Sequence, residues 1–284
     1  MGFFGFYIDP TYLLIFFITL AISIAAQVFM SSTYKKWNQV RNGPDLSGTE
    51  AGYAIVNRTG LGGGRPVSVT SLETPELKKL AELRDQGLVT EQEYLAKKSQ
   101  IKMPQVSDTG VNTSQIEFQH ASGNLTDHYD PRTNTVRLSD GVGKRHSVAA
   151  MAIVAHELGH AQQHENNSFL ITMRNFLVPA VSLSPQIAYF LILIGLIFNL
   201  AGAFWLGVVF YGLMVLFSIV TLPVEFDASR RARKLLREAG LMVNEQDEIG
   251  SQRVMLAAAS TYVAAAVTAV LQLLYYISIG RRRS

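Results

Sequence analysis

The chain has 284 residues, of which 48% are hydrophobic and only 17% are charged, with a formal net charge of +3. Soluble proteins carry about a quarter charged residues, so this composition indicates a membrane protein of one or two domains. The absence of cysteine excludes disulfides and thiolate metal sites, and the small, dispersed positive charge gives no sign of a nucleic-acid-binding surface.

Long uncharged stretches are the strongest signal of architecture. A membrane-spanning helix needs about 20 apolar residues. Pro10–Ser32 and Val254–Gly280 each meet this length, and Asn175–Val224 is long enough for two spans joined by a turn near Asn199–Gly202. We therefore predict a mainly α-helical membrane protein with about four transmembrane helices: an anchor at 10–32, a hairpin at 177–222 and a C-terminal helix at 254–280.

The basic residues predict how these spans are oriented. Lys35, Lys36 and Arg41 follow the first span and no basic residue precedes it, which is the reverse of a signal peptide. The positive-inside rule then places the N-terminus outside and the following segment in the cytoplasm. The basic residues from Arg230 to Arg253 predict the same side. Arg281–Arg283 also favour the cytoplasmic side for the end of the last helix. Four spans that start outside would instead place these residues outside. A re-entrant or interfacial last helix would remove this conflict.

Two helical segments are predicted after the first span. In 43–66, Ser47 and Glu50 form a capping box for a short amphipathic helix, which a glycine-rich loop follows. The second segment is a helical hairpin at 74–102. In it, Thr74 and Pro75 begin one helix and Gly87 ends it, while Thr90 and Glu93 form a second capping box.

The hairpin at 74–102 resembles the SHOCT module, a small two-helix element that is thought to support oligomerisation. The resemblance implies a homo-oligomer formed through this hairpin. The alternative is a solvated, charged hairpin inserted in a loop.

The segment 114–174 is expected to begin with a β-hairpin. Ile116–Ser139 contains a short alternating run after a turn at Asp130–Asn134. The free edge of a strand can take up an extended peptide as one more strand. The candidate substrate edge is Val136, Arg137, Leu138 and Ser139, and the alternative is an ordinary structural hairpin.

The next helix, predicted over Val148–Gln163 with Ser147 as its N-cap, carries the pattern His-Glu-Leu-Gly-His at 156–160. Its two histidines lie four residues apart and therefore on one helix face, where both imidazoles can reach one Zn²⁺. Glu157 is placed to act as the general base toward a water that the metal activates.

A third ligand is needed because catalytic zinc sites keep three protein ligands and one open position. The two predicted crossings return the segment 223–253 to the side of the membrane on which the histidines lie. Glu225 is the best candidate for the third ligand in this segment. Asp227 is the next choice, either as a ligand or as an acceptor for a ligand histidine. His164 lies a further turn along the helix and is disfavoured. The remaining histidines are interpreted as structural, and the alternative is that one of them lines the cleft or stabilises the oxyanion. They are His120, His128 and His146.

Four segments in order, 123–132, 135–139, 155–161 and 222–229, resemble the YugP-like neutral zinc metallopeptidases of bacterial membranes. That family is similar to the HtpX and CAAX-protease gluzincins, which implies a zincin-like metallopeptidase core, zinc, a cytoplasmic-facing site and embedding in the lipid bilayer. In those relatives an Asp four residues after the ligand Glu often supports a ligand histidine. Here that position is Ser229, so Asp227 or Ser229 would substitute for it.

The sequence thus predicts a multi-pass membrane zinc endopeptidase that acts on peptides or membrane proteins. Two other functions stay open. One is a non-catalytic, zinc-stabilised membrane scaffold, and the other is a metal-responsive regulator or transport component.

Overall fold

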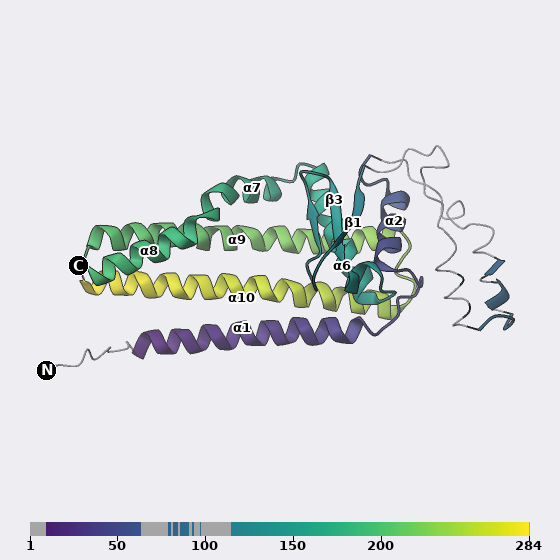
Figure 1. The fold of residues 1–284 in the computed structure, drawn as a ribbon, viewed down its shortest axis with the longest axis horizontal. Coiled ribbons are helices and arrows are strands. Elements are labelled where there is room, and N and C mark those ends of the chain that lie inside the picture. The colour runs from purple at the N-terminus through teal and green to yellow at the C-terminus, as the bar shows by residue number, and fades with distance from the viewer. Residues whose placement is uncertain are drawn as a thin grey trace.

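A computed structural model describes residues 10–63 and 115–283, together with 79–80, 82–84, 86–90, 93 and 97. Long helices run side by side as a bundle, and a small domain that contains a three-stranded sheet lies around one end of it (Figure 1). The chain passes along this bundle four times. The resolved start of the first helix and the end of the last therefore lie at the end of the bundle away from the small domain (Figure 1).

The bundle is built from α1 (Pro10–Trp37), the pair α7 (Phe169–Ser182) and α8 (Ser184–Ile197), α9 (Ala201–Glu238) and α10 (Glu245–Arg283). By length and composition, α1, α9 and α10 are each able to cross a membrane, and α7 with α8, bent by 44°, makes a fourth candidate span. Large apolar side chains such as Leu14 and Phe17, each 60% exposed, cover the outside of the bundle. Such a surface fits lipid and confirms a membrane protein.

Two predicted boundaries in this bundle are wrong. The turn before α9 lies where it was expected, with Asn199 at a φ of 52°. However, α9 continues through Pro223 to Glu238, and α10 begins at Glu245, not at 254. A buried stripe that includes Val224, Ala228 and Leu235 continues past Pro223. Its burial offsets the free-energy cost of the backbone hydrogen bond that a proline removes inside a helix. The last helix, α10, is unbroken, and it is long and apolar enough to cross a membrane.

The small domain packs its helices around α6 (Val148–Glu165), which contacts α2 (Gly48–Thr59), α5 (Asp140–Gly143), α9 and α10. The first half of α6 is almost completely buried, so it forms the centre of the main hydrophobic core. The predicted capping box of α2 is confirmed: the Glu50 N–H donates to Ser47 Oγ at 3.3 Å, and the Ser47 N–H donates to Glu50 Oε2 at 2.7 Å.

The sheet consists of β1 (Glu117–Ala121), β2 (His128–Asp130) and β3 (Thr135–Ser139) in the order β1-β3-β2. Only β2 and β3 form the predicted hairpin, and β1 adds to β3 in parallel. The predicted substrate edge at Val136–Ser139 is therefore wrong. It is the central strand, with β1 paired along its whole length and β2 covering the other side up to Arg137.

The described residues on the two sides of 64–114 meet, because the Gln115 N–H donates to the Gly62 carbonyl oxygen at 3.1 Å. Most of the predicted hairpin at 74–102, including Thr74 and Pro75, lies outside the described residues. Two of its predicted features are described and confirmed. Gly87 ends a helix at a φ of 71°, and Thr90 and Glu93 form the second capping box, with the Glu93 N–H donating to Thr90 Oγ1 at 3.3 Å.

Candidate metal centre

The position of α6 brings its histidines to the membrane helices. Ser147 caps the helix as predicted, accepting a hydrogen bond from the Ala150 N–H at 3.1 Å. Gly159 then lies against α9 so closely that an added Cβ would stand 2.4 Å from the Ala228 carbonyl oxygen. Glycine is required at this point, since any side chain would push the two helices apart.

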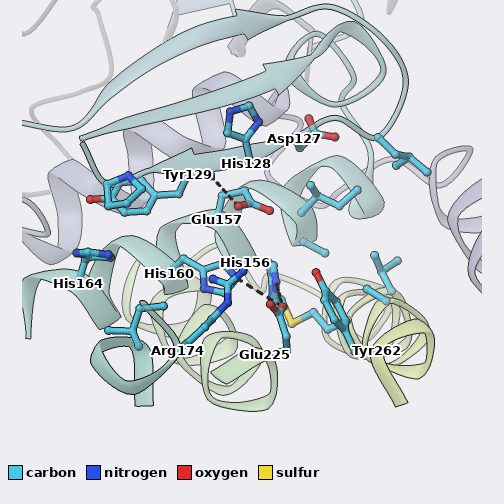
Figure 2. Close-up of a pocket in the computed structure, with 18 of the residues that line it drawn as sticks. Asp127, His128, Tyr129, His156, Glu157, His160, His164, Arg174, Glu225 and Tyr262 are labelled. Atoms are coloured by element: carbon cyan, nitrogen blue, oxygen red, sulfur yellow. Dashed lines mark hydrogen bonds and ion pairs between the residues drawn. The ribbon is translucent and has the colours of Figure 1, made fainter. Parts of the chain in front are cut away.

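Because α6 and α9 approach so closely, three potential ligands converge. His156 Nε2 lies 3.3 Å and His160 Nε2 lies 3.6 Å from Oε2 of Glu225, whose side chain comes from α9 (Figure 2). The two imidazole rings stand nearly perpendicular, at 84°, with centroids 4.8 Å apart. Glu225 is only 3% exposed, so its carboxylate faces the histidines from inside the protein.

The geometry of these three residues fits a metal ion better than it fits hydrogen bonds. Oε2 of Glu225 is buried and has no hydrogen-bond partner among the described residues. Zinc bonds of about 2.0–2.1 Å at tetrahedral angles place ligand atoms about 3.3–3.4 Å apart. The separations of 3.3 and 3.6 Å agree with this spacing. A divalent cation would therefore supply the partner that the buried carboxylate lacks.

A buried glutamine connects both ligand helices, and sequence reasoning missed it. Gln163 Oε1 lies 3.0 Å from Nδ1 of His160, so it accepts that N–H and leaves Nε2 free for a metal. Its amide nitrogen donates to the Val224 carbonyl oxygen and to Asp227 Oδ2, both at 2.9 Å. Gln163 is fully buried, and the only hint in the sequence is a polar residue within a buried helix.

The two residues expected to support the histidines lie close to them. Ser229 Oγ is 3.3 Å from Nδ1 of His156. Asp227 contacts His160 only indirectly, through the amide of Gln163. The Asp227 carboxylate also accepts hydrogen bonds from Arg230 and, at 2.7 Å, from Nε of Arg231. Asp227 is not part of the ligand group.

Glu157 points toward the space in front of these ligands. It is 8% exposed, and its Oε2 accepts the Tyr129 N–H of β2 at 2.9 Å. Burial raises the pKa of its carboxyl group, and the neighbouring His156 and His160 oppose that rise. The strand beside the site is thus β2, in place of the predicted β3.

A cavity of about 300 Å³ opens beside the cluster, with walls from β2, α1, α6, α7, α9 and α10. His128 and His164 line it, whereas His120 and His146 lie elsewhere, near Asp140 and Asp45. Burial lowers the pKa of His164, and the charges of His160 and Arg174 lower it further. His164 is not part of the ligand group.

Two cavity residues from the membrane helices were also missed by sequence reasoning. Arg174 comes from α7 and Tyr262 from α10, and Figure 2 shows them on opposite sides of the cluster of ligands. The Tyr262 hydroxyl lies beside the Glu225 carboxylate. Both residues lie far from any motif in the sequence, so only the packing of the helices places them at the site.

Comparison with known proteins identifies the family of the chain. Residues 90–281 match the family described as "Putative neutral zinc metallopeptidase", and residues 76–101 match the "Short C-terminal domain" family, SHOCT. The chain is 38% identical over 164 residues to "Putative membrane protease YugP" of Bacillus subtilis (strain 168), which covers 58% of this chain and 72% of that protein. No solved structure matches the chain significantly. Both resemblances seen in the sequence are confirmed, and the chain belongs to the neutral zinc metallopeptidase family.

Proposed function

We propose that this member of the neutral zinc metallopeptidase family is a membrane-embedded zinc endopeptidase, with Glu157 as its general base. One observation carries the proposal. His156, His160 and Glu225 converge at the wall of a cavity, and the buried Glu225 Oε2 lacks a hydrogen-bond partner among the described residues. These three residues would hold the zinc ion. When bound, zinc would lower the pKa of a water and polarise a carbonyl oxygen of the substrate.

Glu157 is positioned for proton transfer by its backbone partner. The Tyr129 N–H holds Oε2 at 2.9 Å, which leaves Oε1 to accept a proton from the attacking water. Glu157 would then pass that proton to the nitrogen of the leaving amine. The raised pKa of the buried carboxyl group favours this role, since a base is most useful when its pKa lies nearer the working pH.

Tyr262 offers the second polar group in the cavity. Its hydroxyl points toward the ligand cluster from α10, on the side away from β2 (Figure 2). We assign it the donation of a hydrogen bond to the substrate carbonyl oxygen as negative charge develops there. A donor fixed in advance stabilises that charge without reorganisation during the reaction.

The walls of the cavity suggest where substrates come from. Four of the six helices and strands that line it, α1, α7, α9 and α10, belong to the bundle, so the substrates are peptide segments at the bilayer surface, including parts of membrane proteins. Lys35, Lys36 and Arg41 lie at or near the end of α1 beside the small domain. By the positive-inside rule these charges support a multi-pass protein of the cell membrane with its site facing the cytoplasm.

The proposal is tested with the full chain purified in detergent or nanodiscs. Glu157→Gln should retain zinc and lose cleavage of an unfolded protein substrate, and His156→Ala should lose both. Glu165→Gln, an exposed change at the end of the same helix, is the matched control and should behave as wild type. Cleavage by the Glu157→Gln variant would refute the base assignment. A wild-type protein that binds zinc and cleaves no unfolded or membrane substrate would point to the scaffold function.

A further inference from the structure

The cavity has a cationic end formed by α7. Arg174 lines it, and its Nε atom is buried without a hydrogen-bond partner among the described residues. Figure 2 shows Arg174 on the same side of the ligand cluster as His160 and His164. Asn175, the next residue of α7, contacts His164 Nε2 through its amide nitrogen at 3.3 Å. None of these neighbours is acidic.

An arginine at this place needs an explanation. It lies near the start of α7, immediately before the uncharged stretch that begins at Asn175, where an arginine commonly extends toward the lipid headgroups. An arginine that served only to reach the lipid headgroups would extend its guanidinium into water. Arg174 instead faces the cavity with a buried, unpaired nitrogen, an arrangement that an incoming anion would satisfy.

Among the described residues, none of the carboxylates that line the cavity forms an ion pair with Arg174. Asp127 accepts hydrogen bonds from the Ser139 N–H and hydroxyl, and Glu157 accepts the Tyr129 N–H. Glu225 faces the two histidines. The anion that pairs with Arg174 would therefore come from the substrate.

The opposite end of the cavity is apolar. Ala152 and Ile153 lie one turn before His156 on α6, while His164 lies two turns after it. An added Cβ at Gly250 of α10 would stand 2.6 Å from Val148 Cγ1, so the early part of α10 lies beside the start of α6. The residues of α10 and α1 that line the cavity at this end are Val254, Met255, Ala258 and Met30.

We propose that this cavity selects peptides with an apolar side chain on one side of the scissile bond and a carboxylate on the other, with Arg174 binding the carboxylate. The inference rests on the proposed peptidase function. A guanidinium binds a carboxylate through two parallel N–H···O bonds, whether that group is an Asp or Glu side chain or a free C-terminus. Arg174 is thus a specificity-determining residue.

The test uses matched peptides that share one apolar residue and differ only on the other side of the scissile bond, where they carry Glu, Gln or Lys. A second pair of peptides differs only in the C-terminus on that same side of the scissile bond, which is a free carboxylate in one peptide and an amide in the other. Wild type should cleave the carboxylate peptides with a kcat/KM on the order of 10- to 100-fold above the amide peptides. The pair with the larger ratio identifies the source of the carboxylate.

Charge reversal gives the sharpest comparison. Arg174→Glu should reverse the preference from Glu to Lys peptides with zinc content unchanged, and Arg174→Gln should abolish the preference without reversing it. Arg253→Glu is the matched control, because it makes the same charge change at an exposed position of α10 outside the cavity. Ala258→Phe should reduce cleavage of peptides with a large apolar residue more than of those with alanine.

The outcomes separate the two proposals. Equal cleavage of Glu, Gln and Lys peptides by wild type, or an unchanged preference in both Arg174 variants, overturns the specificity inference and leaves the peptidase function standing. If Arg174→Glu loses zinc, the preference of Arg174→Gln among the Glu, Gln and Lys peptides decides the specificity inference in its place. If wild type cleaves neither the peptides nor an unfolded protein, the peptidase function itself fails.

Discussion

Replacing Gln163 by methionine tests whether the buried glutamine holds the metal ligands in place. Gln163→Met keeps the length of the side chain and removes its polar atoms. His160 Nδ1 would lose its acceptor at 3.0 Å, and Asp227 would lose one donor at 2.9 Å. Asp227 keeps Arg230 and Arg231, so the main loss falls on His160.

The magnitude follows from these contacts. Removing the partner of a metal-binding histidine typically lowers metal affinity 10- to 100-fold, which is about 1.4–2.7 kcal/mol. In the metal-free protein, the unpaired N–H of His160 would cost a further amount of about 1–3 kcal/mol of folding free energy. The Val224 carbonyl oxygen, which also accepts a hydrogen bond from Gln163, lies within α9 and contributes less to this loss of folding free energy.

The assay is a zinc competition titration with a chelator, together with thermal unfolding in the presence and absence of zinc. Gln163→Met should bind zinc 10- to 100-fold more weakly, and zinc should raise its unfolding temperature less than that of wild type. Gln162→Met is the control, because Gln162 is only part-buried and its described contact is a 3.4 Å hydrogen bond from Arg231. Wild-type zinc affinity in Gln163→Met would refute the argument that Gln163 orients His160.

Three further changes test other parts of the structure. Gly159→Ala should lower both zinc content and thermal stability, because its methyl group would lie 2.4 Å from a carbonyl oxygen of α9, whereas Gly212→Ala has open space and should lower neither; wild-type zinc content in Gly159→Ala would contradict the close helix approach. Tyr262→Phe should reduce kcat on the order of 100-fold with zinc retained, and Tyr276→Phe, further along α10, should not; an unchanged kcat in Tyr262→Phe would remove its assigned role. Replacing 64–113 by a short glycine-serine linker should retain zinc binding, because Gln115 and Gly62 already meet. A smaller oligomer after this replacement, measured by light scattering, would support assembly through 74–102, and lost zinc binding would show that the segment supports the site.

Local features of the structure could be predicted from the sequence because neighbouring residues determine them. The helical spacing of His156 and His160, the cap at Ser147 and the capping box at Ser47 each depend on residues within one turn. The apolar spans were found for the same reason, since each is a continuous stretch of the chain.

Features that depend on distant packing could not be predicted in this way. The parallel pairing of β1 with β3 is a long-range contact that no local pattern encodes, so β3 was mistaken for an edge strand. The predicted transmembrane hairpin ends at residue 222, yet the buried residues beyond Pro223 keep α9 continuous. Arg174 and Tyr262 reach the cavity only because α7 and α10 pack beside α6 and α9, and a single arginine or tyrosine carries no signal of its own.

The continuity of α9 also fixes the depth of the proposed site. The uncharged part of α9, from Ala201 to Val224, is about 36 Å long at 1.5 Å per residue, and the hydrocarbon core of a bilayer is about 30 Å thick. Glu225 follows immediately, so in a bilayer that α9 spans the ligand cluster would lie where the helix leaves the lipid. Since α1, α7 and α10 also form walls of the cavity, a scissile bond would have to approach the bilayer surface to reach Glu157. A peptide segment held at that surface would reach Glu157 without a further search, which favours substrates that are themselves attached to the membrane.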